Sequence, residues 1–145
     1  MMISVLKFGG SSVASATNLS RVLDIVEKEQ GRVVLISSAI SGCTDAFLKG
    51  DEGSIAAMET RHRDMVTRLF TGEERQRIQQ QVDALFAALR KAPKDEQVTF
   101  GELLSTTILA AKLRTEGKNT AWLDSRELVV KDDEPLTYSK IKTAR

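Results

Sequence analysis

The sequence has very little cysteine, no long apolar run and no excess of charge of either sign. Cys43 is the single cysteine among 145 residues, so an internal disulfide is excluded and a reducing cytoplasm fits best. No apolar run is long enough to span a bilayer, and the N-terminal MMISVLKFGG lacks the pattern of a secretory signal. The 21 basic and 20 acidic residues nearly cancel, which gives no electrostatic reason to expect nucleic acid or an anionic membrane. We therefore expect a cytoplasmic protein that binds neither.

What is present is the composition of an ordinary globular domain, with 41% apolar and 28% charged residues. Short apolar runs predict strands at residues 3–8, 33–36 and 120–123. Helical spacing of apolar residues predicts helices over residues 19–26, 55–69, 78–89 and 104–111. The first helix is expected to start after Ser15 or Thr17 and to end at Gly31. Pro93 is expected to end the third helix and Gly117 the last. A polar loop is expected from Lys131. This order predicts an α/β domain with a mainly parallel sheet, and residues 51–94 predict a helical insertion beside it.

The sharpest local feature is KFGGSSV, residues 7–13, at the end of the first predicted strand. A lysine that ends an apolar strand is expected to face a cleft and an anion, because burying an unpaired ammonium is costly. Two glycines and two serines follow, and their backbone and hydroxyl donors ahead of a helix are suited to phosphate. From these residues alone, a tight turn with a surface lysine is an equally good interpretation.

A second polar loop, residues 37–45, follows the second predicted strand with the sequence SSAISGCTD. Parallel sheets bind ligands at the carboxyl ends of their strands, so these small hydroxyl side chains are candidates to bind a substrate carboxylate. Taken alone, the loop is better explained as a cap, with Thr44 or Asp45 starting the next helix.

A third feature is FGELLS, residues 100–105, where Glu102 falls in the first turn of a helix. An ionised glutamate at this position can hold a substrate ammonium group. The interaction of its charge with the helix dipole explains the residue without any ligand, and by itself is the better explanation.

Two other patterns are set aside. The triplet His62-Arg63-Asp64 is similar to part of a protein-kinase catalytic loop, but the downstream asparagine and the Asp-Phe-Gly motif are absent. His62 lies on the apolar stripe of its predicted helix, which favours a packed histidine at the edge of the core. Cys43 has no cysteine or histidine at metal-ligand spacing, so no protein metal site is expected.

Together, these segments resemble the aspartokinase family within the amino-acid kinase superfamily. The resemblance is carried by KFGGSSV at 7–13, SAISGCTD at 38–45, GELLS at 101–105 and WLDSR at 122–126. It implies a three-layer αβα fold of the amino-acid-kinase type. It also implies ATP-dependent phosphorylation of the side-chain carboxylate of L-aspartate, the reaction that leads into lysine, threonine and methionine biosynthesis.

The resemblance also assigns residues to ligands. The ATP phosphates are expected at Lys7, Phe8, Gly9, Gly10 and Ser11. Aspartate is expected at Ser38, Thr44 and Glu102. The chemistry is then in-line attack on the γ-phosphorus, with Lys7 and Mg²⁺ neutralising charge and no side chain needed as a base.

Family members continue into a second glycine-rich segment that completes the nucleotide site. We therefore expect residues 1–145 to be the N-terminal part of the catalytic domain of a homo-oligomeric parent, either stand-alone or fused to homoserine dehydrogenase, and to lack kinase activity alone. Two alternatives remain open. One is an amino-acid kinase for glutamate or carbamate, against which the GCTD and Gly-Glu segments argue. The other is a non-catalytic binding domain.

Overall fold

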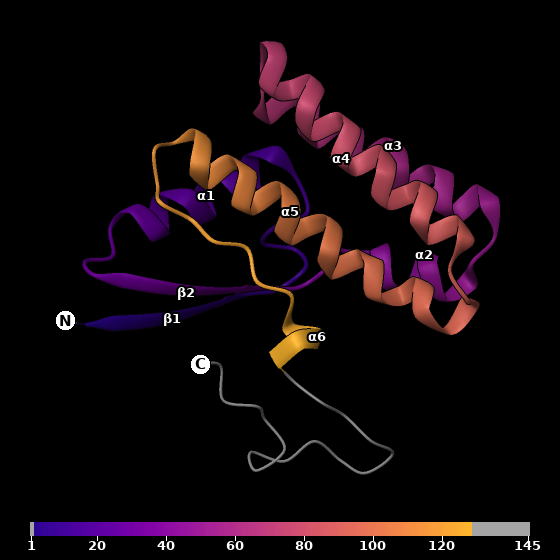
Figure 1. The fold of residues 1–145 in the computed structure, drawn as a ribbon, viewed down its shortest axis with the longest axis horizontal. Coiled ribbons are helices and arrows are strands. Elements are labelled where there is room, and N and C mark those ends of the chain that lie inside the picture. The colour runs from indigo at the N-terminus through magenta and orange to yellow at the C-terminus, as the bar shows by residue number, and fades with distance from the viewer. Residues whose placement is uncertain (1, 129–145) are drawn as a thin grey trace.

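The computed structural model describes residues 2–128, which form an α/β arrangement of a small sheet under a layer of helices (Figure 1). In chain order the elements are β1 (Ile3–Phe8), α1 (Ala16–Glu27), β2 (Arg32–Ser37), α2 (Cys43–Lys49), α3 (Glu52–Leu69), α4 (Gly72–Lys91), the 3-10 helix η1 (Lys94–Thr99), α5 (Phe100–Thr115) and α6 (Ser125–Leu128). The polar stretch predicted from Lys131 lies outside the described residues.

The sheet consists of β1 and β2, which pair in parallel from Ile3 opposite Arg32 to Phe8 opposite Ser37. The connection between them is α1, as parallel pairing requires a crossover. Ser15 is the N-cap of this helix, since its Oγ accepts a hydrogen bond from the backbone N–H of Asn18 at 3.1 Å. The α/β class and the parallel pairing predicted from the sequence are confirmed.

The predicted strand at residues 120–123 is wrong, because this segment has no regular secondary structure. It runs beside α5 instead, where Trp122 Nε1 donates to Thr106 Oγ1 at 2.8 Å and Arg114 Nε donates to the Thr120 carbonyl at 3.1 Å. A strand needs a neighbouring strand for its backbone hydrogen bonds. Within residues 2–128 this segment has helix side chains as partners instead.

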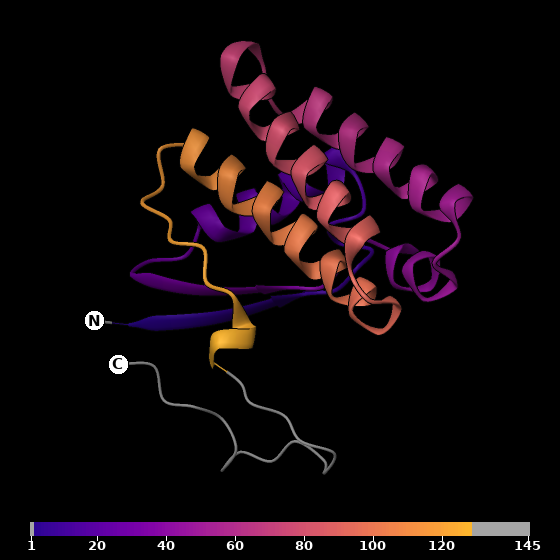
Figure 2. The same ribbon diagram turned by 45° about the vertical axis from the view of Figure 1, so that its right-hand side comes forward.

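The predicted helical insertion is the pair α3 and α4, which lie side by side and extend beyond the sheet (Figure 2). The Asp51 side chain accepts from the Ser54 backbone N–H at 2.9 Å and so caps the start of α3. Arg90 on α4 binds both Glu52 and Glu59 on α3, with N–O distances of 2.9 and 3.0 Å. These contacts fix the two helices against each other.

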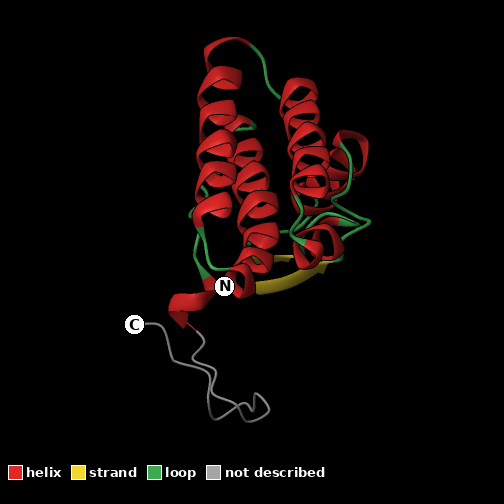
Figure 3. Ribbon diagram, turned by 90° about the vertical axis from the view of Figure 1, so that its right-hand side faces the viewer, coloured by secondary structure: helices red, strands yellow, loops and turns green. Residues whose placement is uncertain are grey.

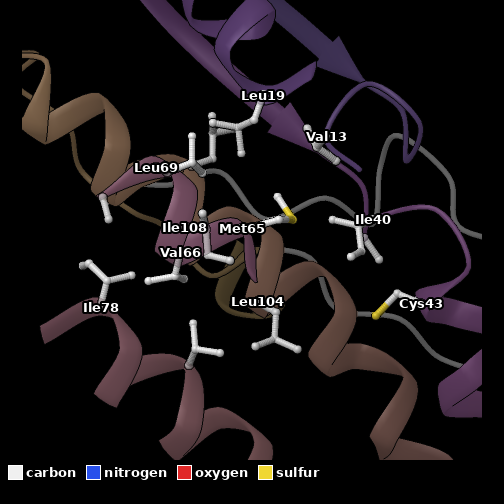
Figure 4. Close-up of a cluster of buried hydrophobic side chains, with 14 of the residues drawn as sticks. Val13, Leu19, Ile40, Cys43, Met65, Val66, Leu69, Ile78, Leu104 and Ile108 are labelled. Atoms are coloured by element: carbon white, nitrogen blue, oxygen red, sulfur yellow. The ribbon is translucent and has the colours of Figure 1, made fainter. Parts of the chain in front are cut away.

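The core lies where α1, α2, α3, α4 and α5 meet (Figure 4). Phe86 is fully buried there and packs edge-on against Phe47, with ring centroids 6.1 Å apart, and against His62 at 5.5 Å. The periodic apolar positions predicted from the sequence supply much of this core. His62 is packed as predicted, but it lies fully inside the core and not at its edge.

The helices cover one face of the sheet (Figure 3). On that face Phe8 and Leu35 pack against the core. The opposite face carries Ile3, Val5 and Val34, which are 61%, 64% and 49% exposed, and no helix covers it within residues 2–128. No helix in the same range is long and apolar enough to cross a membrane.

Candidate functional site

The candidate site lies where β1 and β2 end, because both predicted polar loops leave the sheet at the same edge. The turn after β1 spans residues 9–15, and the loop after β2 spans residues 38–42, with α2 beginning at Cys43. The parallel register brings Phe8 opposite Ser37, so the two loops start side by side. This edge is the usual location for ligands in parallel sheets.

Lys7 connects the two loops directly. Its Nζ donates to Ser38 Oγ at 2.6 Å and to the backbone carbonyl of Phe8 at 3.1 Å. The side chain is exposed, so the ammonium group is open to a ligand, and it can donate to a further acceptor besides these two. The residue predicted to bind phosphate and a residue predicted to bind aspartate are therefore in contact.

Gly10 allows the two loops to approach closely. The Ser38 N–H donates to the Phe8 carbonyl and the Ser41 N–H donates to the Gly10 carbonyl, both at 3.1 Å. A Cβ on Gly10 would lie 2.8 Å from the Ala39 carbonyl oxygen, so any other residue would push the loops apart. A Cβ on Gly9 would meet nothing within 4 Å, so packing does not require a glycine there.

Ser11 lies on the exposed side of the turn, and its backbone carbonyl accepts from Asn18 Nδ2 at 2.9 Å. An open hollow of about 340 Å³ lies next to it, lined by Phe8, Ser11, Ser12, Asn18, Arg21, Val22 and Ile25. Neighbouring side chains on a strand point to opposite faces, so Phe8 and this hollow lie on the helix-covered side while Lys7 starts from the other. The hollow and the Lys7–Ser38 contact are thus separate features.

The start of α5 packs on the loop after β2 and places Glu102 beside it. A Cβ on Gly101 would lie 2.7 Å from Ala39 Cβ, so the glycine allows this close approach. One turn further along, Ser105 Oγ donates to the Ser38 carbonyl at 2.7 Å. Glu102 itself is exposed at this junction.

The pKa of Cys43, the first residue of α2, is shifted by burial and by nearby charges. Its thiol is fully buried, and burial, together with the negative charge of Glu102, raises its pKa to about 12. The positive charge of Arg61 acts in the opposite direction. Cys43 is therefore a neutral packing residue at the start of α2.

Thr44 lies in the first turn of α2 and is exposed. The residue before Cys43 is Gly42, which begins the helix in the left-handed region at a φ of 86°. In residues 2–128 no hydrogen bond joins Thr44 to Lys7, Ser38 or Glu102. The structure thus places Thr44 in α2, just after the loop that carries Ser38, and no hydrogen bond joins the two residues among those described.

Arg61 and Ser105 contact this loop but were not identified from the sequence. Arg61 Nη1 donates to the Ser41 carbonyl at 2.7 Å. Both residues lie on helices, and Arg61 belongs to no local motif that signals a role. The serine next to GELL gave a partial signal, since Ser105 ends that segment.

Residues 2–128 contain no group of three or more histidine, cysteine, aspartate or glutamate side chains placed to hold a metal ion. The donors around Lys7 are an ammonium group, hydroxyls and backbone groups, which suit an anion better than a cation.

Comparison with known proteins gives a consistent result. The model of the amino acid kinase family matches residues 2–145. Lysine-sensitive aspartokinase 3 of Escherichia coli strain K12 is 30% identical over 147 residues, which cover 90% of this chain and 33% of that protein. The chain therefore spans about a third of the length of this relative.

Solved structures show the same likeness. The structure of E. coli aspartokinase III in complex with lysine and aspartate superposes with a TM-score of 0.81 at 25% identity, covering 90% of this chain and 33% of that one. The structure of E. coli aspartokinase III in complex with aspartate and ADP gives a TM-score of 0.71 at 27% identity, over 91% and 33% of the two chains. The resemblance to aspartokinases predicted from the sequence is confirmed.

Proposed function

The chain belongs to the amino acid kinase family, and from this membership we propose that it is the substrate- and phosphate-binding part of an aspartokinase. The proposed reaction transfers the γ-phosphoryl group of ATP to the side-chain carboxylate of L-aspartate. The contact between Lys7 and Ser38 carries the proposal, because it joins the turn suited to phosphate to the loop suited to a substrate. The names of the similar proteins, all aspartokinases, support the choice of aspartate.

In the proposed mechanism the two loops hold two anions side by side. Lys7, the backbone of Phe8, Gly9 and Gly10, and the Ser11 hydroxyl bind the phosphates. A carboxylate oxygen of aspartate forms a bond to the γ-phosphorus while the bond from that phosphorus to the bridging oxygen of ADP breaks. The carboxylate is already ionised, so no base is needed, and Lys7 stabilises the charge on the transferring group.

The substrate side of the site is proposed to use Ser38, Thr44 and Glu102. Hydroxyl groups can donate to a carboxylate, and a glutamate carboxylate can accept from an ammonium group. The exposed position of Glu102 beside the loop supports this role. Mg²⁺ remains part of the proposal because phosphoryl transfer uses it to neutralise the phosphates. No residue among 2–128 is assigned to hold it, and no step is assigned to it.

The proposal is tested by kinetics on the natural full-length protein with aspartate, glutamate and carbamate as acceptors. Aspartate-dependent ADP release is expected, and Lys7→Ala is expected to lower kcat roughly hundredfold or more, a loss of about 3 kcal/mol, with a smaller effect on the KM for aspartate. Lys28→Ala is the matched control, because Lys28 is an exposed lysine after α1. Preference for glutamate or carbamate would reject aspartate as the substrate, and near-normal turnover of Lys7→Ala would reduce Lys7 to a surface residue.

A further inference from the structure

Hydrogen bonds from several separate elements hold the loop at residues 38–42. The turn after β1 accepts the Ser41 N–H, and Ser105 on α5 donates to the Ser38 carbonyl. A further contact comes from α3, the first helix of the insertion, where Arg61 Nη1 donates to the Ser41 carbonyl at 2.7 Å. A helix that the sequence placed merely beside the sheet thus contacts the candidate substrate loop.

Arg61 is suited to hold this loop because the contact is short and its donor is charged. A hydrogen bond from a guanidinium group is stronger than one between neutral groups. The side chain is half-buried, and Nη1 also lies 3.7 Å from Met58 Sδ on the same helix. The neighbouring residue His62 is fully buried against Phe86, so the backbone that carries Arg61 is anchored in the core.

The contacted segment needs such support. Gly42 follows Ser41 in the left-handed region and is exposed, and α2 starts there without a side-chain cap. A glycine in a loop is the residue with the most backbone freedom to lose. A Cβ on Gly42 would lie 3.4 Å from Arg61 Nη1, so the arginine also packs against this position.

We propose that Arg61 is a positioning residue that holds residues 38–44 in the conformation that binds the acceptor amino acid. It acts on the acceptor through the Ser41 carbonyl and does not need to touch the substrate. The proposal rests on the function proposed above, because it assigns the loop to the acceptor. It predicts that the insertion helix α3 contributes to acceptor affinity and not to ATP affinity.

The test compares Arg61→Ala, Arg61→Lys and the control Arg63→Ala in the natural full-length protein. Arg63 lies on the same helix but faces Asp83 on α4 at 3.6 Å, away from the loop. Hydrogen–deuterium exchange of peptides covering residues 38–44 is expected to quicken about tenfold in Arg61→Ala and to stay unchanged in Arg63→Ala. In the same variant the KM for aspartate is expected to rise about tenfold, with the KM for ATP within about twofold.

Arg61→Lys should recover part of both losses, since lysine keeps the charge and a donor but not the planar reach of arginine. Unchanged exchange at residues 38–44 in Arg61→Ala would overturn the proposal whether or not the protein phosphorylates aspartate. Faster exchange with an unchanged KM for aspartate would overturn it as well. A failure of the proposed function is distinguishable, because it would appear as absent aspartate kinase activity in the unmodified protein.

Discussion

The helical layer and the sheet bury their apolar side chains to very different extents. In the helical layer Phe47 and Phe86 are completely buried among α2, α3, α4 and α5. In the sheet, Val5 and Val34 leave about half or more of their surface exposed, although both lie in regular strands. A pair of strands with one covered face gains little stability by itself. The helices therefore carry most of the stability of the described residues.

The candidate binding side chains, in contrast, lie mostly at the ends of the strands and not inside the helical layer. Lys7 and Ser38 lie at or just after the strand ends, and both are accessible. Glu102 lies on a helix, but at its first turn, where α5 meets the loop after β2. Candidate binding groups therefore sit at the exposed edge of the sheet and are held by a rigid helical layer, as expected for sites that a scaffold positions.

The strongest test of this comparison is to remove a large side chain from each region of the 145-residue chain. Phe86→Ala is expected to lower the free energy of unfolding by about 3–5 kcal/mol, because it leaves a cavity next to Phe47 and His62. Val34→Ala on the exposed face should cost less than about 1 kcal/mol. Urea unfolding of both variants measures the difference.

Equal losses of unfolding free energy for Phe86→Ala and Val34→Ala would show that the sheet and the helical layer contribute alike to stability. A large loss of unfolding free energy for Val34→Ala that is seen in the natural full-length protein, but not in the 145-residue chain, would show that another segment covers this face of the sheet in the longer protein.

The same contrast explains what could be predicted from the sequence. Periodic apolar residues such as Ile78 and Val82 predicted the buried faces of helices, because helix amphipathicity is a local pattern. The KFGGSSV segment was located by its lysine and glycines. Arg61 was missed because its role depends on a contact across twenty residues of sequence that no local pattern encodes. The false strand at residues 120–123 has the same cause, since strand formation depends on a partner and not on propensity alone.

The second test uses pH on the helical layer. His62 Nδ1 contacts the Met58 carbonyl at 2.7 Å and so acts as the donor, while Nε2 is buried without a partner among the described residues. Burial, partly opposed by the Met58 hydrogen bond and aided by the positive charge of Arg61, lowers the pKa of His62 from 6.5 to about 4. Between these values the unfolded chain binds a proton that the native state does not. The contribution is therefore complete above about pH 6.5 and is lost as pH falls toward 4, by about 3 kcal/mol in total.

Urea unfolding at a series of pH values between 7 and 4 checks this, with His62→Leu as the variant that cannot titrate. The difference in pH slope between the two proteins isolates His62 from all other groups. The carboxyls of Asp51 and Asp124, whose pKa values are lowered below 3.8, titrate beneath this window. Parallel slopes would show that protonated His62 is tolerated and that the helical core is less tightly closed than its burial indicates.

The smallest change in kinetics or stability is expected from Glu102, where the helical layer meets the candidate site. Glu102 lies in the first turn of α5, and its side chain is exposed. Glu102→Gln in the natural full-length protein keeps the shape of the side chain and removes its charge. If the carboxylate binds the ammonium group of aspartate, the KM for aspartate should rise by the equivalent of about 1–3 kcal/mol while the KM for ATP stays nearly constant. If Glu102 only interacts with the helix dipole, the kinetics should be intact and the loss of stability should stay below about 1 kcal/mol.

Glu116→Gln is the matched control, because Glu116 follows the other end of α5, where it pairs with Lys112 at 3.1 Å. Measuring both KM values and the melting temperature of the two variants separates these roles, and an unchanged KM for aspartate would assign Glu102 to the scaffold and not to the site.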